Sequence, residues 1–229
     1  MGDNKSKIKK AHSKAVILLS GGQDSTTCLA WAKKKFDKVS AITFDYGQRH
    51  KIELLSAKKI AKLSNTPLKI IKIDIFKHLT KNALIDKSVK IKIQKNKLPT
   101  TFVPGRNLIF ISIALIYAYQ QNIQNIVTGV CQTDFSGYPD CRNKLIKSLE
   151  KTFELATNRR FFIHTPLMWL TKSKTVHLMQ KLGSLNLLKY THTCYKGLRP
   201  ACGTCPACKL RIKGFKEAKI KDPLKYAKK

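Results

Sequence analysis

A glycine turn directly behind a short apolar run is the feature that most constrains how this chain folds. Residues 15–19 are apolar, and the turn that follows reads Ser20-Gly21-Gly22-Gln23-Asp24-Ser25. The apolar run has the length of a buried strand, and residues 26–34 have the pattern of a helix. Glycine allows backbone angles that other residues resist, so successive N–H groups can point at a ligand beside the positive end of the helix. The sequence therefore predicts a pyrophosphate-binding loop in a βαβ unit, in preference to an ordinary glycine turn.

Further apolar runs alternate with helical patterns along the 229 residues. Runs of strand length lie at 39–44, 68–76, 125–130 and 161–165, and helical patterns lie at 52–63, 108–120, 142–150 and 166–182. Such alternation is typical of a parallel sheet with right-handed crossovers and helices on both faces. We therefore predict an α/β, Rossmann-like fold.

Changes in composition suggest how the chain is divided. Residues 1–13 are polar and basic, and we predict a flexible tail there. The nucleotide-binding domain is expected at 14–185, with a lysine-rich flap near 77–100, because a long loop inside a compact domain is more often functional or mobile than rigid. Residues 186–229 carry most of the closely spaced cysteines, and we predict a zinc-binding tail.

Polar loops follow the predicted strands at the end where a parallel sheet binds ligands. The loop after the second strand contributes Tyr46 and Gln48 as candidates for substrate contact. The loop after the fourth strand contributes two carboxylates, Asp134 and Asp140. Asp140 has an equally plain alternative role as the N-cap of the helix that follows it.

Arg106 stands at the entry of the helix predicted at 108–120, beside the expected phosphate site. A guanidinium binds anions through two parallel hydrogen bonds, so we predict that Arg106 clamps phosphate. The alternative is a surface arginine in a Pro-Gly turn. Asn107 is of a residue type that caps helices, and we expect it to cap the same helix.

Four of the seven cysteines lie close together near the end of the chain: Cys194, Cys202, Cys205 and Cys208. Two C-x-x-C steps share Cys205, and such a step places two thiolates on one metal ion. Four thiolates suit a structural zinc site with no open position, and we favour zinc over an iron–sulfur cluster.

The composition is strongly basic, with 45 Lys and Arg against 13 Asp and Glu and a net charge of +32. Such a charge usually indicates nucleic-acid binding. However, the basic residues are mostly lysines and are dispersed along the chain, so we expect no specific nucleic-acid site. We also expect a cytoplasmic protein that does not cross a membrane, because no apolar run is long enough to do so.

Taken in chain order, several segments resemble the 7-cyano-7-deazaguanine synthase family of the PP-loop ATP pyrophosphatase superfamily. They are SGGQDSTTC, FDYGQRH, FVPGRN, TGVCQTDFSGYPDCR, TPLMW and the cysteine tail. The glycine loop alone indicates only the superfamily, whereas SGYPDC and the four cysteines are more specific. The chain departs from the usual pattern at Lys174, where many members have Glu, and at His192, where a Trp is frequent.

The resemblance implies an ATP-dependent C–N ligase of queuosine biosynthesis. Such an enzyme converts 7-carboxy-7-deazaguanine and ammonia into 7-cyano-7-deazaguanine through adenylated intermediates. It implies a homodimer with one zinc per subunit, held by the four cysteines named above, and carboxylates that read the deazaguanine edge, for which Asp134 and Asp140 are the candidates. The implied ATP-binding residues are Leu18, Leu19, Ser20, Gly21, Gly22, Gln23, Asp24, Ser25, Thr26, Thr27 and Cys28.

Asp24 is an acidic residue inside a phosphate site, which is costly unless a cation is shared. We therefore expect Asp24 to face a magnesium ion that arrives with ATP, and its alternative role is the N-cap of the helix behind the loop. No general base is evident in the sequence. His50 is a candidate, but a structural role is favoured for it.

Two other functions compete with this interpretation. A PP-loop enzyme that adenylates a tRNA base directly would share the glycine loop and suit the charge. A zinc-ribbon RNA-binding module with an inactive nucleotide fold would share the cysteines. ATP turnover in the presence of 7-carboxy-7-deazaguanine separates the three.

Overall fold

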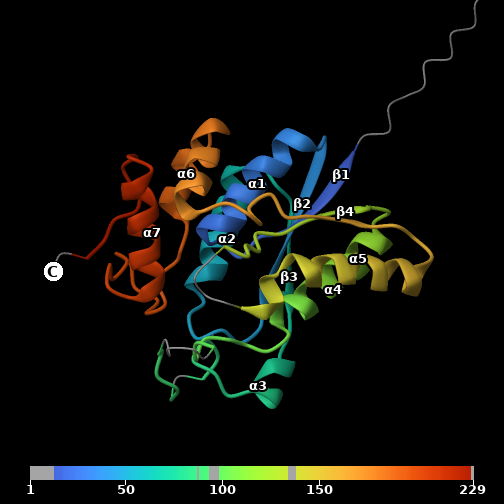
Figure 1. The fold of residues 1–229 in the computed structure, drawn as a ribbon, viewed down its shortest axis with the longest axis horizontal. Helices are drawn as coiled ribbons and strands as arrows, with labels where there is room; N and C mark the ends of the chain where they lie inside the picture. Colours follow the sequence, from blue (N-terminus) through green and yellow to red (C-terminus); the bar gives the residue numbers. More distant parts are fainter. Residues whose placement is uncertain (1–12, 87, 93–97, 134–137, 228–229) are drawn as a thin grey trace, which may run out of the picture.

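The computed structural model describes residues 13–86, 88–92, 98–133 and 138–227 (Figure 1). Its centre is a parallel five-stranded sheet in the order β3-β2-β1-β4-β5. The strands are β1 (Lys14–Leu18), β2 (Lys38–Asp45), β3 (Leu68–Lys72), β4 (Asn125–Val127) and β5 (Phe162–His164). This arrangement confirms the predicted α/β fold class.

Helices fill the connections between the strands. They are α1 (Gln23–Lys35), α2 (Ile52–Leu63), α3 (Ile75–Leu79), α4 (Arg106–Gln120), α5 (Asn143–Thr157), α6 (Lys172–Lys181) and α7 (Pro206–Glu217), with short 3₁₀ turns η1 (Pro139–Cys141) and η2 (Leu185–Tyr190). In the described part of the chain, none of these helices has the length and apolar character needed to cross a bilayer.

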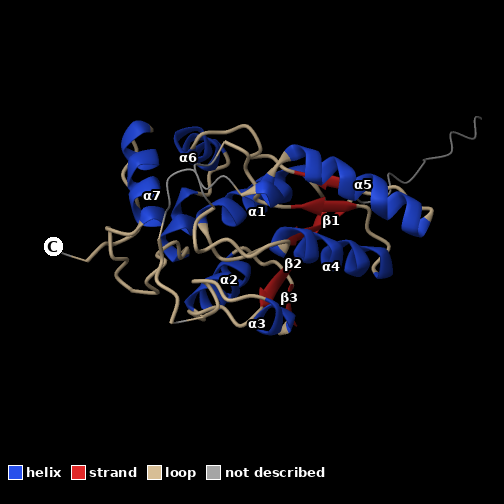
Figure 2. Cartoon of the chain, turned by 60° about the horizontal axis from the view of Figure 1, so that its bottom comes forward, coloured by secondary structure: helices blue, strands red, loops and turns tan. Residues whose placement is uncertain are grey.

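Both faces of the sheet are covered, and Figure 2 shows the strands enclosed by helices. Successive strand residues point to opposite faces. Val16 of β1 therefore belongs to an apolar cluster with residues of α4 and α5, such as Leu115 and Ile146. Its neighbour Ile17 belongs to a second cluster with residues of α1 and α2, such as Leu29. Burial on both faces explains why β1 reads as a continuous apolar run.

Several element boundaries differ from the sequence-based predictions. The strand predicted at 125–130 ends at Val127, and the helix predicted at 142–150 extends to Thr157. The strand predicted at 68–76 ends at Lys72, and residues 75–79 form α3 instead. Lys72 pairs with Asp45, the last residue of β2, so this edge strand ends where its only partner ends. The helix predicted at 166–182 begins only at Lys172, because the Thr171 side chain accepts a hydrogen bond from the Lys174 N–H and caps it.

The predicted flap near 77–100 lies partly outside the described residues, at 87 and 93–97. Its described part is anchored to the domain at its start, where Asn82 and Ala83 are buried. The Arg49 N–H donates to the Leu84 carbonyl over 2.7 Å, which joins the segment to the loop after β2. Mobility of this segment stays a prediction, as does that of residues 1–12, which also lie outside the described range.

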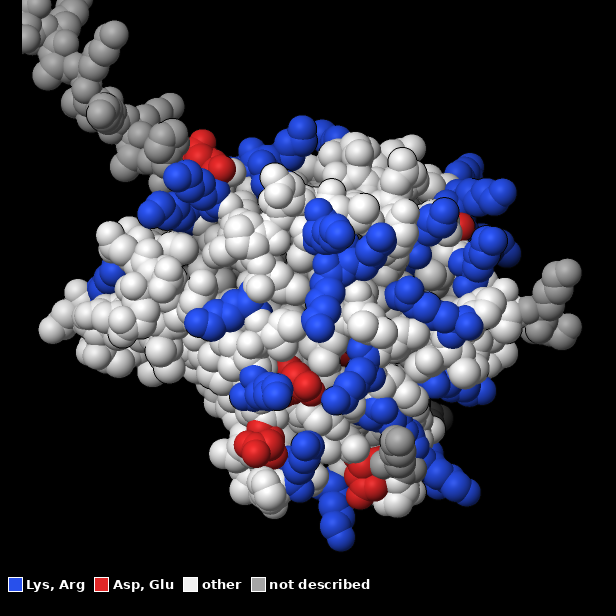
Figure 3. All heavy atoms as spheres, turned by 180° about the vertical axis from the view of Figure 1, so that it is seen from behind, with Lys and Arg blue, Asp and Glu red and all other residues white. Residues whose placement is uncertain are grey.

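The C-terminal segment packs against the sheet domain. Phe215 of α7 and Val176 of α6 share an apolar cluster with Ala30 of α1, and α6 and α7 lie at one end of the molecule (Figure 1). The surface charge is dispersed: on the face in Figure 3, Lys and Arg side chains are scattered among other residues and do not form one continuous stripe.

Candidate active site

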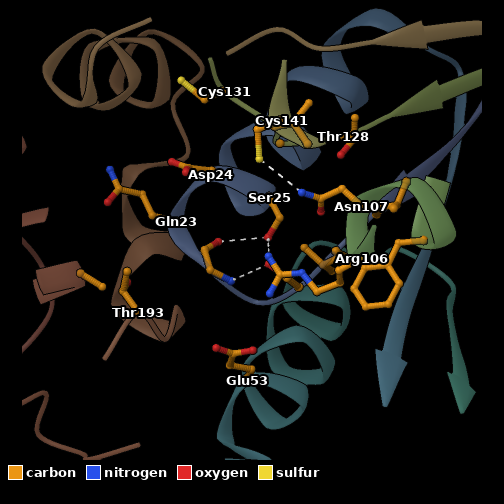
Figure 4. Close-up of a pocket in the computed structure, with 18 of the residues that line it drawn as sticks. Gln23, Asp24, Ser25, Glu53, Arg106, Asn107, Thr128, Cys131, Cys141 and Thr193 are labelled. Atoms are coloured by element: carbon orange, nitrogen blue, oxygen red, sulfur yellow. Dashed lines mark hydrogen bonds between the residues drawn. The ribbon is translucent and has the colours of Figure 1, made fainter. Parts of the chain in front are cut away.

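A cavity of about 350 Å³ lies at the carboxyl ends of the central strands. Its walls come from the glycine loop, the loops after β2 and β4, the start of α4 and the cysteine tail (Figure 4). Ten of the residues selected from the sequence line it: Leu18, Leu19, Ser20, Gly22, Gln23, Asp24, Ser25, Tyr46, Gln48 and Arg106.

The glycine loop is shaped by close backbone contacts. Gly21 has φ +85°, and a Cβ there would lie 2.4 Å from the Glu53 carbonyl oxygen and 2.7 Å from the Ala57 nitrogen. Only glycine therefore lets α2 approach the loop. Gly22 occupies the N-cap position of α1, and no side chain caps the helix. The first N–H groups of α1, which have no partner within the helix, can therefore bind an anion.

The last three residues of the predicted ATP-binding stretch do not reach the cavity. The hydroxyls of Thr26 and Thr27 donate to the carbonyls of Gly22 and Gln23, over 2.7 and 3.0 Å. Cys28 is fully buried. All three side chains are fully buried within α1, and the two hydroxyls are already bonded to the helix backbone, so they support the loop and offer no donors to a phosphate.

Asp24 has a partner that the sequence did not reveal. Its Oδ2 lies 2.5 Å from the Nζ of Lys172, which stands at the start of α6 and also lines the cavity. Its Oδ1 is buried and has no hydrogen-bond partner among the described residues. Asp24 does not cap α1, so that alternative role is wrong. The only local signal for Lys172 was its position at a helix entry after an apolar segment.

Arg106 lines the cavity, so the alternative of a surface arginine does not hold. The capping roles expected nearby are wrong. Asn107 lies inside α4, and its side-chain amide donates to Cys141 Sγ over 3.2 Å. Asp140 does not cap α5; its Oδ2 accepts the Asn107 backbone N–H over 3.0 Å and so stabilises the start of α4. Its Oδ1 is buried without a hydrogen-bond partner in the described part of the chain.

The side chains of the remaining substrate candidates differ in their contacts within the protein. Tyr46 is packed near Phe76 and Phe110, and burial raises the pKa of its phenol to about 12. The Gln48 amide is engaged at both ends, because it accepts from the Tyr46 N–H and donates to the Phe44 carbonyl. Gln48 therefore braces the end of β2 beside the cavity. Asp134 lies outside the described residues.

Glu53 is a cavity residue that the sequence analysis did not select. It stands in the first turn of α2, and Figure 4 shows it facing the same space as Arg106 and Ser25. Burial raises the pKa of its carboxyl to about 7, although the nearby Arg106 acts in the opposite direction. His50, the candidate base, instead lies against Gly197 of the cysteine tail.

The four tail cysteines form one cluster, as predicted. Their sulfur atoms all lie within 4.8 Å of one another, and those of Cys202 and Cys208 are 3.9 Å apart. A tetrahedral ion with metal–sulfur distances of about 2.3 Å needs sulfurs about 3.8 Å apart, so the cluster fits such an ion. The N–H groups of Thr204 and Cys205 point at Cys202 Sγ over 3.4 and 3.3 Å, which favours a thiolate there.

The cysteine cluster is joined to the glycine loop through His192. The His192 N–H donates to the Gly21 carbonyl over 2.9 Å, and its imidazole Nε2 lies 2.9 Å from the Cys194 carbonyl oxygen. Burial lowers the pKa of this imidazole. Further along the tail, the buried Arg211 forms a bidentate ion pair with Asp222 and also lines the cavity.

Comparison with known proteins identifies close relatives. The family described as "Queuosine biosynthesis protein QueC" matches residues 14–219. A 7-cyano-7-deazaguanine synthase of Chromobacterium violaceum is 50% identical over 216 residues, which cover 92% of this chain and 92% of that protein. The enzyme of the same name from Bacillus subtilis is 50% identical over 206 residues, covering 89% and 94%. A solved 4-thiouridine synthetase–RNA complex with bound ATP is 18% identical and superposes with a TM-score of 0.47 over 90% of this chain and 50% of that one.

Proposed function

The chain belongs to the QueC family of queuosine biosynthesis proteins, and from this premise we propose that it makes 7-cyano-7-deazaguanine. It is an ATP-dependent ligase whose substrates are 7-carboxy-7-deazaguanine and ammonia. The proposal rests on one observation. The 7-cyano-7-deazaguanine synthase of Chromobacterium violaceum is 50% identical to this chain over a region that covers 92% of both proteins.

The reaction needs two activations of a poor acyl donor. Attack of the substrate carboxylate on the α-phosphate of ATP gives an acyl-adenylate and releases pyrophosphate. Ammonia displaces AMP to give the amide, and activation of the amide oxygen followed by its loss gives the nitrile. Charge develops on phosphate oxygens in each activation, so fixed positive groups around the phosphates lower the barrier.

We assign the phosphate end of the cavity to the glycine loop together with Arg106 and Lys172. The uncapped N-terminus of α1 and the two cationic side chains support this assignment. Asp24 is suited to a magnesium ion that arrives with ATP, because its Oδ1 is buried and has no hydrogen-bond partner among the described residues. Such an ion would neutralise charge on the phosphates.

The substrate end is assigned to Tyr46, Gln48, Asp134 and Asp140. Asp140 has one carboxylate oxygen left for the deazaguanine edge, since its Oδ2 is taken by Asn107. Gln48 would act through the backbone that it braces.

We propose that Cys194, Cys202, Cys205 and Cys208 hold one zinc ion per chain. Four thiolates leave no position for water, so the ion is structural: it fixes the segment that places His192 and Tyr195 in the cavity wall.

One incubation tests the function. Protein, ATP, magnesium, ammonium and 7-carboxy-7-deazaguanine should give the nitrile by mass spectrometry, with AMP and pyrophosphate in the phosphorus NMR spectrum. ATP consumption should require the carboxylated substrate. ADP and phosphate as primary products would overturn the adenylation route.

Direct adenylation of a tRNA base is the less favoured function. The relatives that match nearly end to end carry the synthase name, and the basic side chains on the face in Figure 3 are dispersed. Any RNA affinity should therefore collapse between low and physiological salt. Sequence-selective tRNA binding at physiological salt would reverse this preference.

We further propose that two copies pair and work in the cytoplasm, where four thiolates stay reduced. Leu108, Ile116 and Tyr119 of α4 are exposed along one line, and subunit contacts commonly bury such apolar surface. Sedimentation of the purified protein as a monomer at micromolar concentration would contradict the pairing.

A further inference from the structure

Among the described residues, the carboxylates of Asp24 and Glu53 line the cavity, and their surroundings differ. Asp24 is ion-paired with Lys172. In the described part of the chain, no hydrogen bond or ion pair joins the Glu53 side chain to another residue. Unlike Asp24 Oδ1, the carboxylate oxygens of Glu53 are not fully enclosed by protein atoms. Glu53 is thus the cavity carboxylate whose oxygens are open to a ligand.

The groups that face Glu53 come from three other segments. They are the Arg106 guanidinium at the start of α4, the Tyr46 phenol after β2 and the Tyr195 phenol in the cysteine tail. Burial raises the pKa of both phenols, so both are neutral near pH 7. In the part of the chain that the structure describes, Arg106 is therefore the charge that acts on Glu53, and it favours the carboxylate. Desolvation acts in the opposite direction and is the larger effect, with a resulting pKa of about 7.

Other titratable groups in the described wall of the cavity are poorly placed for proton transfer near neutral pH. Asp24 is held by Lys172. The Nε2 of the His192 imidazole lies 2.9 Å from the Cys194 carbonyl oxygen and is engaged there. Glu53 can both take and release a proton under conditions in which the enzyme works.

The proposed reaction has a step that needs such a group. At neutral pH ammonia is almost entirely ammonium, which has no lone pair with which to attack. We propose that Glu53 takes the proton from ammonium in the cavity, and this inference rests on the proposed synthase function. Ammonium gives one proton to the Glu53 carboxylate, and its nitrogen then forms a bond to the acyl carbon. The bond from that carbon to the AMP oxygen breaks, AMP leaves with the electron pair, and the nitrogen loses a second proton to solvent.

Hydroxylamine separates this role from a structural one, because it is largely uncharged at pH 7 and needs no deprotonation before it attacks. With ammonium, Glu53→Gln should make nitrile at least about 100-fold more slowly than the wild type. With hydroxylamine in place of ammonium, the same variant should form the hydroxamate at a rate within about threefold of the wild type. Glu154→Gln, an exposed change on α5, is the matched control and should alter neither rate.

The pH profile gives a second readout. In the wild type, kcat/KM for ammonium should show a break near pH 7 in addition to the rise caused by free ammonia, and Glu53→Gln should lack it. Glu53→Asp keeps a carboxylate and should retain the break at a lower rate, so it serves as the test should Glu53→Gln fail to fold.

Three results would overturn the inference: equal losses with ammonium and hydroxylamine, an unchanged rate with ammonium, or a pH break that survives in Glu53→Gln. Equal losses would make Glu53 a substrate-binding residue. Failure of the proposed function itself is distinct, because the wild type would then form neither nitrile nor hydroxamate.

Discussion

The glycine loop lines the cavity directly, whereas the cysteine cluster lies behind the tail residues that line it, such as Thr193 and Tyr195. The two regions are also built from different groups of atoms. The loop presents main-chain N–H groups, and two close approaches shape it: α2 lies against Gly21, and Gly129, which follows β4, lies against the backbone of Asp24 and Ser25. The cluster acts through four side chains whose sulfur atoms converge on one point. A site formed by backbone N–H groups is lost when the backbone changes its conformation. A site formed by side chains is lost when one of the side-chain atoms that bind the ligand is removed. The two regions should therefore fail in different ways.

The largest effect is expected at the cluster. Cys205→Ser removes one of four thiolates, and because metal binding is coupled to folding, the tail should lose its zinc and its order. We expect less than about 0.2 equivalents of zinc by elemental analysis and a melting temperature lower by about 10 °C or more.

Cys131→Ser is the matched control, since Cys131 is a buried cysteine outside the cluster. It should keep a full equivalent of zinc. A stable Cys205→Ser protein that retains the metal would show that the cluster does not depend on all four thiolates, and would contradict the predicted difference between the two regions.

At the glycine loop, the addition of a single methyl group should be sufficient to destabilise the fold. Gly21→Ala would place Cβ against the backbone of α2 at a positive φ, and we expect a loss of about 2–4 kcal/mol in the free energy of unfolding. Zinc content should stay at one equivalent. Denaturant unfolding measures the effect.

Gly183→Ala separates crowding from backbone strain. Gly183 has φ +66°, and apart from its chain neighbours no described residue comes within 4 Å of the place that an alanine Cβ would occupy, so this change should cost only about 1 kcal/mol. Equal losses for the two variants would mean that the close approach of α2 does not shape the loop.

A smaller effect is expected for Asp24→Asn, which leaves the shape of the loop unchanged and removes one charge. Turnover should fall at least about tenfold, or about 1.4 kcal/mol in the barrier. Loss of the pair with Lys172 should lower the free energy of unfolding by about 1 kcal/mol. Full activity would show that the Asp24 charge serves the fold alone.

The smallest effect concerns Glu53, on the boundary between the two regions. Its folded-state pKa of about 7 lies above the ordinary value of 4.5, so the carboxyl costs nothing in stability below pH 4.5, and the cost grows until the pH passes 7. Glu53→Gln removes this cost, so the variant should have a higher melting temperature than the wild type at pH 8. The difference should vanish near pH 4.5. A variant less stable than the wild type at pH 8 would contradict the assigned pKa.

Local patterns were sufficient to predict the fold class, the glycine loop and the cysteine cluster. Each depends on residues that are close in sequence, such as the apolar run before Gly21 or the two C-x-x-C steps around Cys205. The end of β3 could not be predicted in this way, because it is determined by where β2 ends.

The missed parts of the site depend on long-range contacts. Lys172 pairs with Asp24 across 148 positions of sequence, and Asp140 stabilises a helix that begins before it in the chain. Nothing next to Glu53 in the sequence indicates its raised pKa, because the desolvation comes from the surrounding segments. Charge pairs and burial between distant segments are properties of the folded chain, and so no local pattern encodes them.

The central position of β1 has a consequence for synthesis on the ribosome. β1 is made before its partners: it pairs with β2 on one edge, but its other edge belongs to β4, which begins at Asn125. Until that residue has been translated, the nascent chain carries an apolar strand with one open edge, the kind of surface that chaperones cover. The glycine loop is completed later still, because its contacts Lys172 and His192 follow all five strands in the chain. A chain cut short before them could build most of its sheet and would still lack a finished phosphate site.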